Sequence, residues 1–188
     1  MAPRGGGPAA KSVKIGITGL PGSGKTEALE KVIEMLERDQ KTVGGMVTKP
    51  MFDHHRLVGI YVIDWMTKQK DVLAHIDYES NVSVGRFGVD MKRLEEIGVK
   101  AIETAVDKAD IIVIDEVGKM EVESPTFVAA VKRALDATKP MLLTLHKKSR
   151  NPLLQDIRRR DDVRILEVTP INRNLLPFKI IKLLKDEG

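Results

Sequence analysis

The octapeptide GLPGSGKT, residues 19–26, constrains this chain more than any other feature, because it matches the phosphate-binding pattern G-x-x-x-x-G-K-[ST]. Glycines let such a loop come close to an anion, and its N–H groups and the following helix dipole then face phosphate oxygens. Lys25 is expected to reach the β- and γ-phosphates, and the Thr26 hydroxyl to ligate Mg²⁺. Apolar residues 13–18 and the helical spacing of 27–39 predict the strand and helix that flank such a loop. The predicted nucleotide-binding residues are therefore Gly19, Leu20, Pro21, Gly22, Ser23, Gly24, Lys25 and Thr26.

Strands and helices alternate along the rest of the chain, which predicts an α/β fold with a mostly parallel sheet and helices on both faces. We expect strands at 42–48, 56–65, 109–114, 140–145 and 163–168, and helices at 90–107, 124–137, 153–160 and 172–185. The segment MFDHH (51–55) suits a hairpin turn, so the strands at 42–48 and 56–65 would form an antiparallel addition at one edge. Residues 78–89 are predicted to be a loop.

Composition narrows the classes of protein to which the chain can belong. Its 188 residues suit a single domain, placed at 12–188, after a Gly/Pro-rich leader at 1–11 that we expect to be disordered. The absence of Cys excludes disulfides and thiolate metal sites. No apolar run approaches the ~20 residues of a membrane span, and no signal peptide is evident, so we expect a cytoplasmic protein without a membrane partner. We also expect a monomer. A net charge of +4 and 4% aromatic content do not favour nucleic acid as a partner.

A second part of the site is predicted where an apolar strand segment ends in two acids. Asp115 occupies the position of a Walker B aspartate and would hold Mg²⁺ together with Thr26. Glu116 would lie near the γ-phosphate, where a carboxylate could orient or deprotonate an attacking water. The alternative is a strand that merely ends in exposed acids.

The next strand, MLLTLH, carries Thr144 and His146 at its carboxyl end, where ligands of α/β sheets bind. Either residue could sense the γ-phosphate, and the alternative is a core threonine and a surface histidine. His54, His55 and His75 lack the spacing of metal ligands and are expected to be exposed.

Arginines and one asparagine near the end of the chain give weaker signals. Arg158, Arg159 and Arg160 follow one another, and one of them could act as a lid or arginine finger over the triphosphate. A solvated helix face is the alternative. Asn172 and Arg173 could contact base or ribose, or Asn172 could cap the last helix.

Several longer segments resemble the THEP-type nucleoside-triphosphatases, a family of small archaeal, bacterial and animal P-loop enzymes. The resemblance covers nearly the whole chain and rests on GLPGSGKT, VGRFGVDM, ADIIVIDEVGKME followed by SPTF, and TLHKKSRNPLLQDIR through VTPINR. It implies a RecA-like sheet and slow, Mg²⁺-dependent hydrolysis of several triphosphates, among them ATP, GTP, CTP and UTP. It also implies nucleotide contact at Ile111, Ile112, Val113, Ile114, Asp115, Glu116, Val117 and Gly118, although we expect the four aliphatic residues at 111–114 to be buried in the sheet.

One segment departs from the family pattern, and it limits what can be carried over. Lys49, Pro50 and Met51 stand where relatives have a Glu-Val-Arg-like stretch, so the role of that acid and arginine is open here, and so is whether Arg56 substitutes for the arginine. The N-K-x-D sequence that recognises guanine is absent, which predicts broad nucleotide use. Two alternatives to hydrolysis are a nucleoside or nucleotide kinase and a nucleotide-switched RNA-binding module. The adjacent acids favour water as the acceptor.

Overall fold

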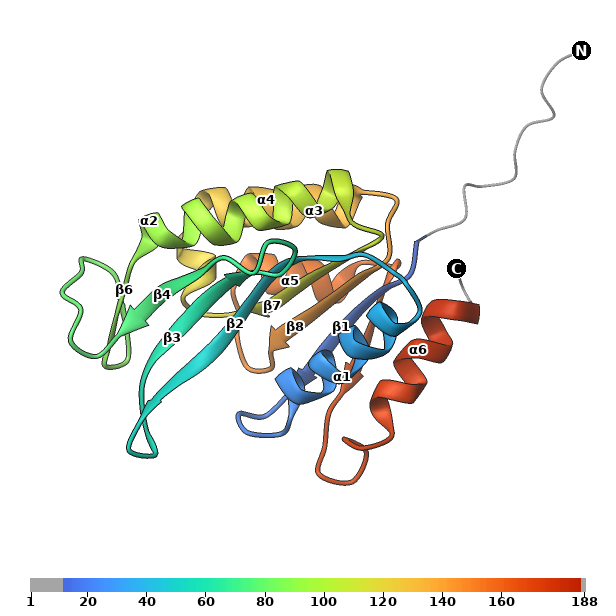
Figure 1. The fold of residues 1–188 in the computed structure, drawn as a ribbon, viewed down its shortest axis with the longest axis horizontal. Coiled ribbons are helices and arrows are strands. Elements are labelled where there is room, and N and C mark those ends of the chain that lie inside the picture. The colour runs from blue at the N-terminus through green and yellow to red at the C-terminus, as the bar shows by residue number, and fades with distance from the viewer. Residues whose placement is uncertain (1–11, 187–188) are drawn as a thin grey trace, which may run out of the picture.

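A nine-stranded sheet organises the computed structural model, which describes residues 12–186, in the order β5-β6-β4-β3-β2-β7-β8-β1-β9. Five strands run parallel, and they are β2 (Val43–Asp53), β7 (Ile111–Val117), β8 (Met141–His146), β1 (Lys14–Gly19) and β9 (Val163–Glu167). Because β8 lies between β1 and β7, the carboxyl ends of these three strands meet at one edge (Figure 1). The predicted leader, residues 1–11, lies outside the described residues.

The antiparallel part of the sheet is larger than the sequence suggests. Strands β3 (Arg56–Asp64), β4 (Lys70–His75), β6 (Phe87–Val89) and β5 (Ser83–Val84) continue the sheet from β2, and we call these four strands the antiparallel wing. The prediction of a loop at 78–89 is therefore wrong, and β4 was not predicted at all. The predicted turn at 51–55 is shorter than expected, since only His54 and His55 form it, both with positive φ.

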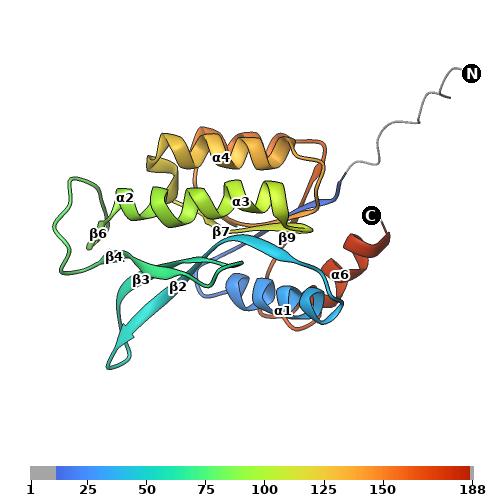
Figure 2. The same cartoon turned by 45° about the horizontal axis from the view of Figure 1, so that its top comes forward.

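Helices cover both faces of the sheet, as predicted (Figures 1 and 2). α1 (Lys25–Arg38) and α6 (Leu176–Asp186) pack on one face. The other face carries α4 (Pro125–Asp136), α5 (Pro152–Arg159) and a continuous helical run made of α2 (Met91–Arg93), a π-helical segment η1 (Leu94–Val99) and α3 (Lys100–Lys108). A short 3₁₀ helix, η2 (Glu121–Glu123), precedes α4.

Local sequence explains where two of these helices begin. The Asp90 side chain accepts a hydrogen bond from the Arg93 N–H, which confirms the predicted N-cap. Ser124 accepts from the Phe127 N–H in the same way, and Pro125 follows at the first helical position, where its missing N–H costs nothing.

The core divides into two clusters, one on each face of the parallel strands. In β7, Ile112 and Ile114 face the α3 and α4 side, whereas Ile111 and Val113 face the α1 and α6 side. Strands that bury both faces need near-continuous apolar sequence, which is what made them recognisable. Among residues 12–186, no helix combines the length and apolar character needed to cross a membrane.

Candidate active site

The phosphate-binding motif forms the loop between β1 and α1. Gly24 has φ 102° and Gly22 has φ 77°, and glycine reaches this left-handed region at little cost. The Ser23 N–H donates to the Leu20 carbonyl at 3.0 Å, and this bond closes the turn. Gly24 directly precedes α1, so the unpaired N–H groups of the first helical turn and the positive end of its dipole lie at the loop. The Ser23 hydroxyl is buried without a hydrogen-bond partner among the described residues.

Asp115 is the best-anchored side chain of the site. Its Oδ1 accepts a hydrogen bond from Thr144 on β8 at 2.5 Å, and its Oδ2 accepts one from Thr26 on α1 at 3.3 Å. The carboxyl is only 2% exposed, and this burial raises its pKa to about 7, although the two threonine hydrogen bonds act in the opposite direction. The two residues predicted to bind Mg²⁺ thus lie together, and their oxygen atoms suit that ion.

Lys25 of α1 and Glu116 of β7 form an ion pair in the same site. Lys25 Nζ lies 2.9 Å from Glu116 Oε2. Strand β7 extends through both acids to Val117, three residues beyond the predicted strand end, and the peptide bond between Asp115 and Glu116 is cis. Glu116 keeps 30% of its side chain exposed, so water can reach the carboxylate.

A third acid, Glu121, was given no role from the sequence and yet is buried beside these two. It is 5% exposed, and burial, followed by the nearby Glu116 charge, raises its pKa to about 8. Gly118 lies against both glutamates, because a Cβ built there would be 2.6 Å from Glu116 Oε1 and 3.1 Å from Glu121 Oε2. No local pattern distinguishes Glu121 from a surface acid, since its burial depends on the turn that follows β7.

The remaining residues predicted on β8 and α5 have different surroundings. His146 ends β8, and its Nδ1 is buried without a hydrogen-bond partner in residues 12–186. Burial lowers the pKa of His146, although Glu116 raises it. Arg158 donates hydrogen bonds to the carbonyls of His146, Lys147 and Ser149, so it fastens the loop after β8 to α5. Arg159 is exposed.

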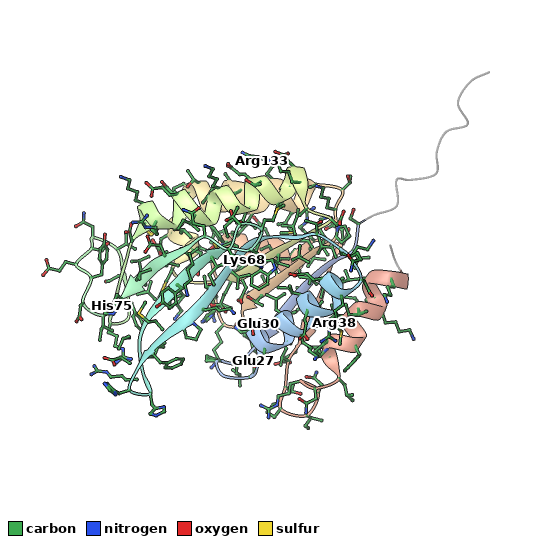
Figure 3. The ribbon with its side chains drawn as sticks, viewed as in Figure 1. Glu27, Glu30, Arg38, Lys68, His75 and Arg133 are labelled. Carbon is green, nitrogen blue, oxygen red and sulfur yellow. The ribbon has the colours of Figure 1, made fainter. Side chains whose placement is uncertain are left out.

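A cavity of about 430 Å³ lies beside the phosphate-binding loop, between α1 and the segment that leads into α6. Its lining consists of Gly22, Gly24, Glu27, Ala28, Lys31, Arg173, Asn174 and Pro177. Arg173, one of the predicted base or ribose contacts, is therefore next to the loop, and Glu27 stands in the first turn of α1 (Figure 3). A volume of this size suits a nucleoside.

Asn172 does not cap the last helix, which begins at Leu176 rather than at the predicted residue 172. Its Oδ1 accepts from the Thr169 N–H and its Nδ2 donates to the Glu167 carbonyl, each at 2.8 Å. The side chain therefore fixes the turn after β9, and the prediction of a helix cap is wrong.

The segment that departs from the family pattern lies in β2, on the side of the sheet next to α1. Lys49 Nζ lies 3.3 Å from Glu30 Oε1, so this lysine links the start of the hairpin to α1; Figure 3 shows Glu30 on that helix. Arg56 is exposed at the start of β3. No group of three or more His, Asp or Glu residues suited to a metal ion exists within residues 12–186.

Comparisons with known proteins agree with this geometry. Residues 14–181 match the model of a protein family described as NTPase. The nucleoside-triphosphatase THEP1 of Thermoplasma acidophilum is 42% identical over 176 residues, which cover 94% of this chain and 97% of the relative. The crystal structure of THEP1 from the hyperthermophile Aquifex aeolicus superposes with a TM-score of 0.82 at 31% identity, covering 92% of this chain and 99% of that one. The solution structure of a human cancer-related nucleoside triphosphatase gives a TM-score of 0.79 at 29% identity, covering 95% and 99%.

Proposed function

Because this chain belongs to the NTPase family, we propose that it hydrolyses nucleoside triphosphates to diphosphates and phosphate, with Mg²⁺ as the cofactor. The observation that carries the proposal is the 2.9 Å contact between Lys25 and Glu116, with Asp115 and Thr26 beside them. Phosphoryl transfer to water requires a phosphate-binding lysine, a carboxylate that water can reach and oxygen ligands for Mg²⁺.

Thr26 and Asp115 are the residues that would hold Mg²⁺. Mg²⁺ in nucleotide sites is usually bound by one or two protein oxygens together with phosphate oxygens and water, so this small donor set fits the ion. The bound ion would neutralise negative charge on the phosphate oxygens. Thr144 would keep Asp115 in place through its hydrogen bond.

Lys25 and Glu116 would act on the reacting atoms. When a triphosphate binds, the Lys25 ammonium exchanges Glu116 for the β- and γ-phosphate oxygens, where negative charge increases in the transition state. The Glu116 carboxylate then orients a water whose oxygen attacks the γ-phosphorus. The water proton passes to Glu116, the bond from the γ-phosphorus to the bridging oxygen breaks, and the diphosphate leaves.

The cavity beside the loop supports broad base specificity. Strong discrimination between bases needs buried polar groups that are left unpaired by the wrong base. Here the polar side chains of the lining, Glu27, Lys31, Arg173 and Asn174, are all exposed. We therefore expect ATP, GTP, CTP and UTP all to be accepted.

Phosphate release measured with each of the four triphosphates and Mg²⁺, with and without a panel of nucleosides and nucleotides, tests the proposal. Hydrolysis predicts release from all four at rates that do not depend on any added acceptor. Release that requires an acceptor, with a phosphorylated acceptor as product, would instead identify a kinase.

A further inference from the structure

Three carboxyl groups and one lysine meet at the end of β7, and the proposed hydrolysis uses only two of those carboxyl groups. Lys25 is paired with Glu116, and Asp115 is held by Thr26 and Thr144. The third carboxyl group, that of Glu121, is buried beside Glu116, and neither the ion pair nor the two threonine hydrogen bonds involve it.

The geometry around Gly118 brings the Glu121 carboxyl next to Glu116. A single point, the position of a Cβ on Gly118, lies 2.6 Å from Glu116 Oε1 and 3.1 Å from Glu121 Oε2. Both carboxyl groups therefore lie close to Gly118, and they leave no room for a side chain at that residue. A larger residue at 118 would require the Glu116 carboxyl to move.

Binding of a triphosphate changes the partners of Glu116. In the structure, the Glu116 carboxylate is held by Lys25 at 2.9 Å. Once that ammonium moves to the phosphates, Glu116 loses the cation and can turn about its side-chain bonds. A general base must stay within hydrogen-bond reach of the water that it deprotonates, so another group has to hold it.

We propose that Glu121 is a positioning residue whose buried carboxylic acid donates a hydrogen bond to the Glu116 carboxylate and keeps it directed at the attacking water. The inference rests on the proposed hydrolysis at this site. It adds a role for a residue that neither binds nucleotide nor touches the reacting atoms. Gly118 contributes by leaving room for the two carboxyl groups to approach.

The environment of Glu121 keeps the proton that this role requires. Burial raises its pKa to about 8, the charges of Glu116 and Asp115 act in the same direction, and hydrogen bonds at the Glu121 and Gly118 backbone only partly oppose them. At neutral pH the side chain is therefore mainly a neutral acid that can donate. A carboxylic acid kept protonated by its surroundings is an established type of hydrogen-bond donor in active sites.

Two substitutions at this position separate donation from mere packing. Glu121→Gln keeps the size and an N–H donor, and its kcat should stay within about threefold of the wild type. Glu121→Ala removes the donor, and its kcat for ATP should fall by ~10–100-fold with KM unchanged, the usual cost of losing an orienting partner. Glu123→Ala is the matched control, because Glu123 is exposed on the same 3₁₀ turn, and it should leave both constants unchanged.

A pH profile of Glu121→Gln gives an answer even if Glu121→Ala does not fold. Wild-type kcat should decline as the pH rises through about 8, where Glu121 ionises and no longer donates, whereas the amide variant should lack this decline. The other charged groups around the pair are the same in both proteins, so the difference between the profiles isolates Glu121. These groups are Asp115 and Glu116 of β7, Lys25 of α1, Lys119 of the following turn and His146 of β8.

The outcomes distinguish failure of this role from failure of the proposed function. An inactive wild type would overturn hydrolysis, and this role with it. If the wild type is active, either of two results would overturn the role of Glu121 alone. In the first, Glu121→Ala has the same kcat as the wild type. In the second, the kcat of Glu121→Gln falls as far as that of Glu121→Ala and declines with pH as the wild-type kcat does.

Discussion

The two ends of the parallel strands both bury charge, but only one of them completes its ion pairs and hydrogen bonds. At the amino end, Lys14 is 2% exposed, and its Nζ donates to the carbonyls of Ala137 and Lys139 at 2.9 and 3.3 Å. Arg160 donates two hydrogen bonds to Asp162 and another to Asp136. The hydrogen bond from Arg160 lowers the pKa of Asp162, as expected for a carboxylate that accepts from a cation.

At the carboxyl end of the parallel strands, acidic side chains outnumber basic ones. Asp115, Glu116 and Glu121 lie near one another there, with Lys25 paired to Glu116, and the pKa values of Asp115 and Glu121 are raised to about 7 and about 8. Ser23 Oγ and His146 Nδ1 are buried there without hydrogen-bond partners among the described residues. An excess of acids and unpaired polar atoms is typical of a site that a cation and a polar ligand complete. Arg160, one of three consecutive arginines predicted to include a lid, belongs to the amino end and has a structural role there.

The largest expected effect is that of Glu116→Gln at the carboxyl end. The amide keeps the size of the side chain but cannot accept a proton from water at neutral pH, so kcat should fall by ~10²–10⁴-fold. Nucleotide affinity, measured by titration of a fluorescent triphosphate analogue, should change little. Glu123→Gln serves as the control, and a near-normal kcat in Glu116→Gln would place the base elsewhere, with His146 the next candidate.

A smaller effect is expected for Thr26→Ala, which removes one of the two oxygen ligands while it leaves the backbone of the loop intact. The Mg²⁺ concentration needed for half-maximal activity should rise by about 10–100-fold, and saturating Mg²⁺ should restore most of the rate. A metal titration that coincides with the wild type would remove Thr26 from the metal site.

The smallest effect on catalysis is expected for Lys14→Met, although this substitution should affect folding. It leaves two carbonyls without their donor, so the free energy of unfolding should fall by about 1–3 kcal/mol in urea titrations. The kcat of the folded protein should not change, because the lysine lies at the opposite end of β1 from the loop. Lys132→Met, at an exposed position on α4, is the control for loss of charge. A lower kcat in fully folded Lys14→Met would show that the two ends of the parallel strands are coupled.

The sequence predicted those parts of the molecule whose signals are contiguous. The phosphate-binding loop, the buried strand before Asp115 and the cap at Asp90 depend on neighbours in the chain, so each was recognisable from a short segment. Strand β4 and the short strands β5 and β6 carry weak patterns. Strand β4 forms because the edge of β3 offers unpaired backbone groups, and β6 and β5 then extend the sheet from β4 in turn.

Long-range contacts explain the rest of what sequence reasoning missed. Arg158 and Arg159 look equivalent in the sequence, yet only Arg158 faces the carbonyls of the loop after β8. Asn172 bonds back to the turn after β9, a partner that its position before a helix does not reveal. The burial of Glu121 likewise depends on the arrangement of β7, η2 and α4, which no short pattern records.

The central claim is that a magnesium nucleotide completes the site at the carboxyl end of the parallel strands. The melting temperature with and without Mg²⁺ and a non-hydrolysable triphosphate tests this claim most directly. Ligand that binds only the folded state at 100 times its Kd adds about 2.7 kcal/mol of stability. We predict that the wild type, Glu116→Gln and Lys14→Met all melt at higher temperature with the complete ligand, and that Lys14→Met gains as much as the wild type. An unchanged melting temperature in the wild type would show that the carboxyl end of the sheet is not completed by a magnesium nucleotide, and would contradict this account.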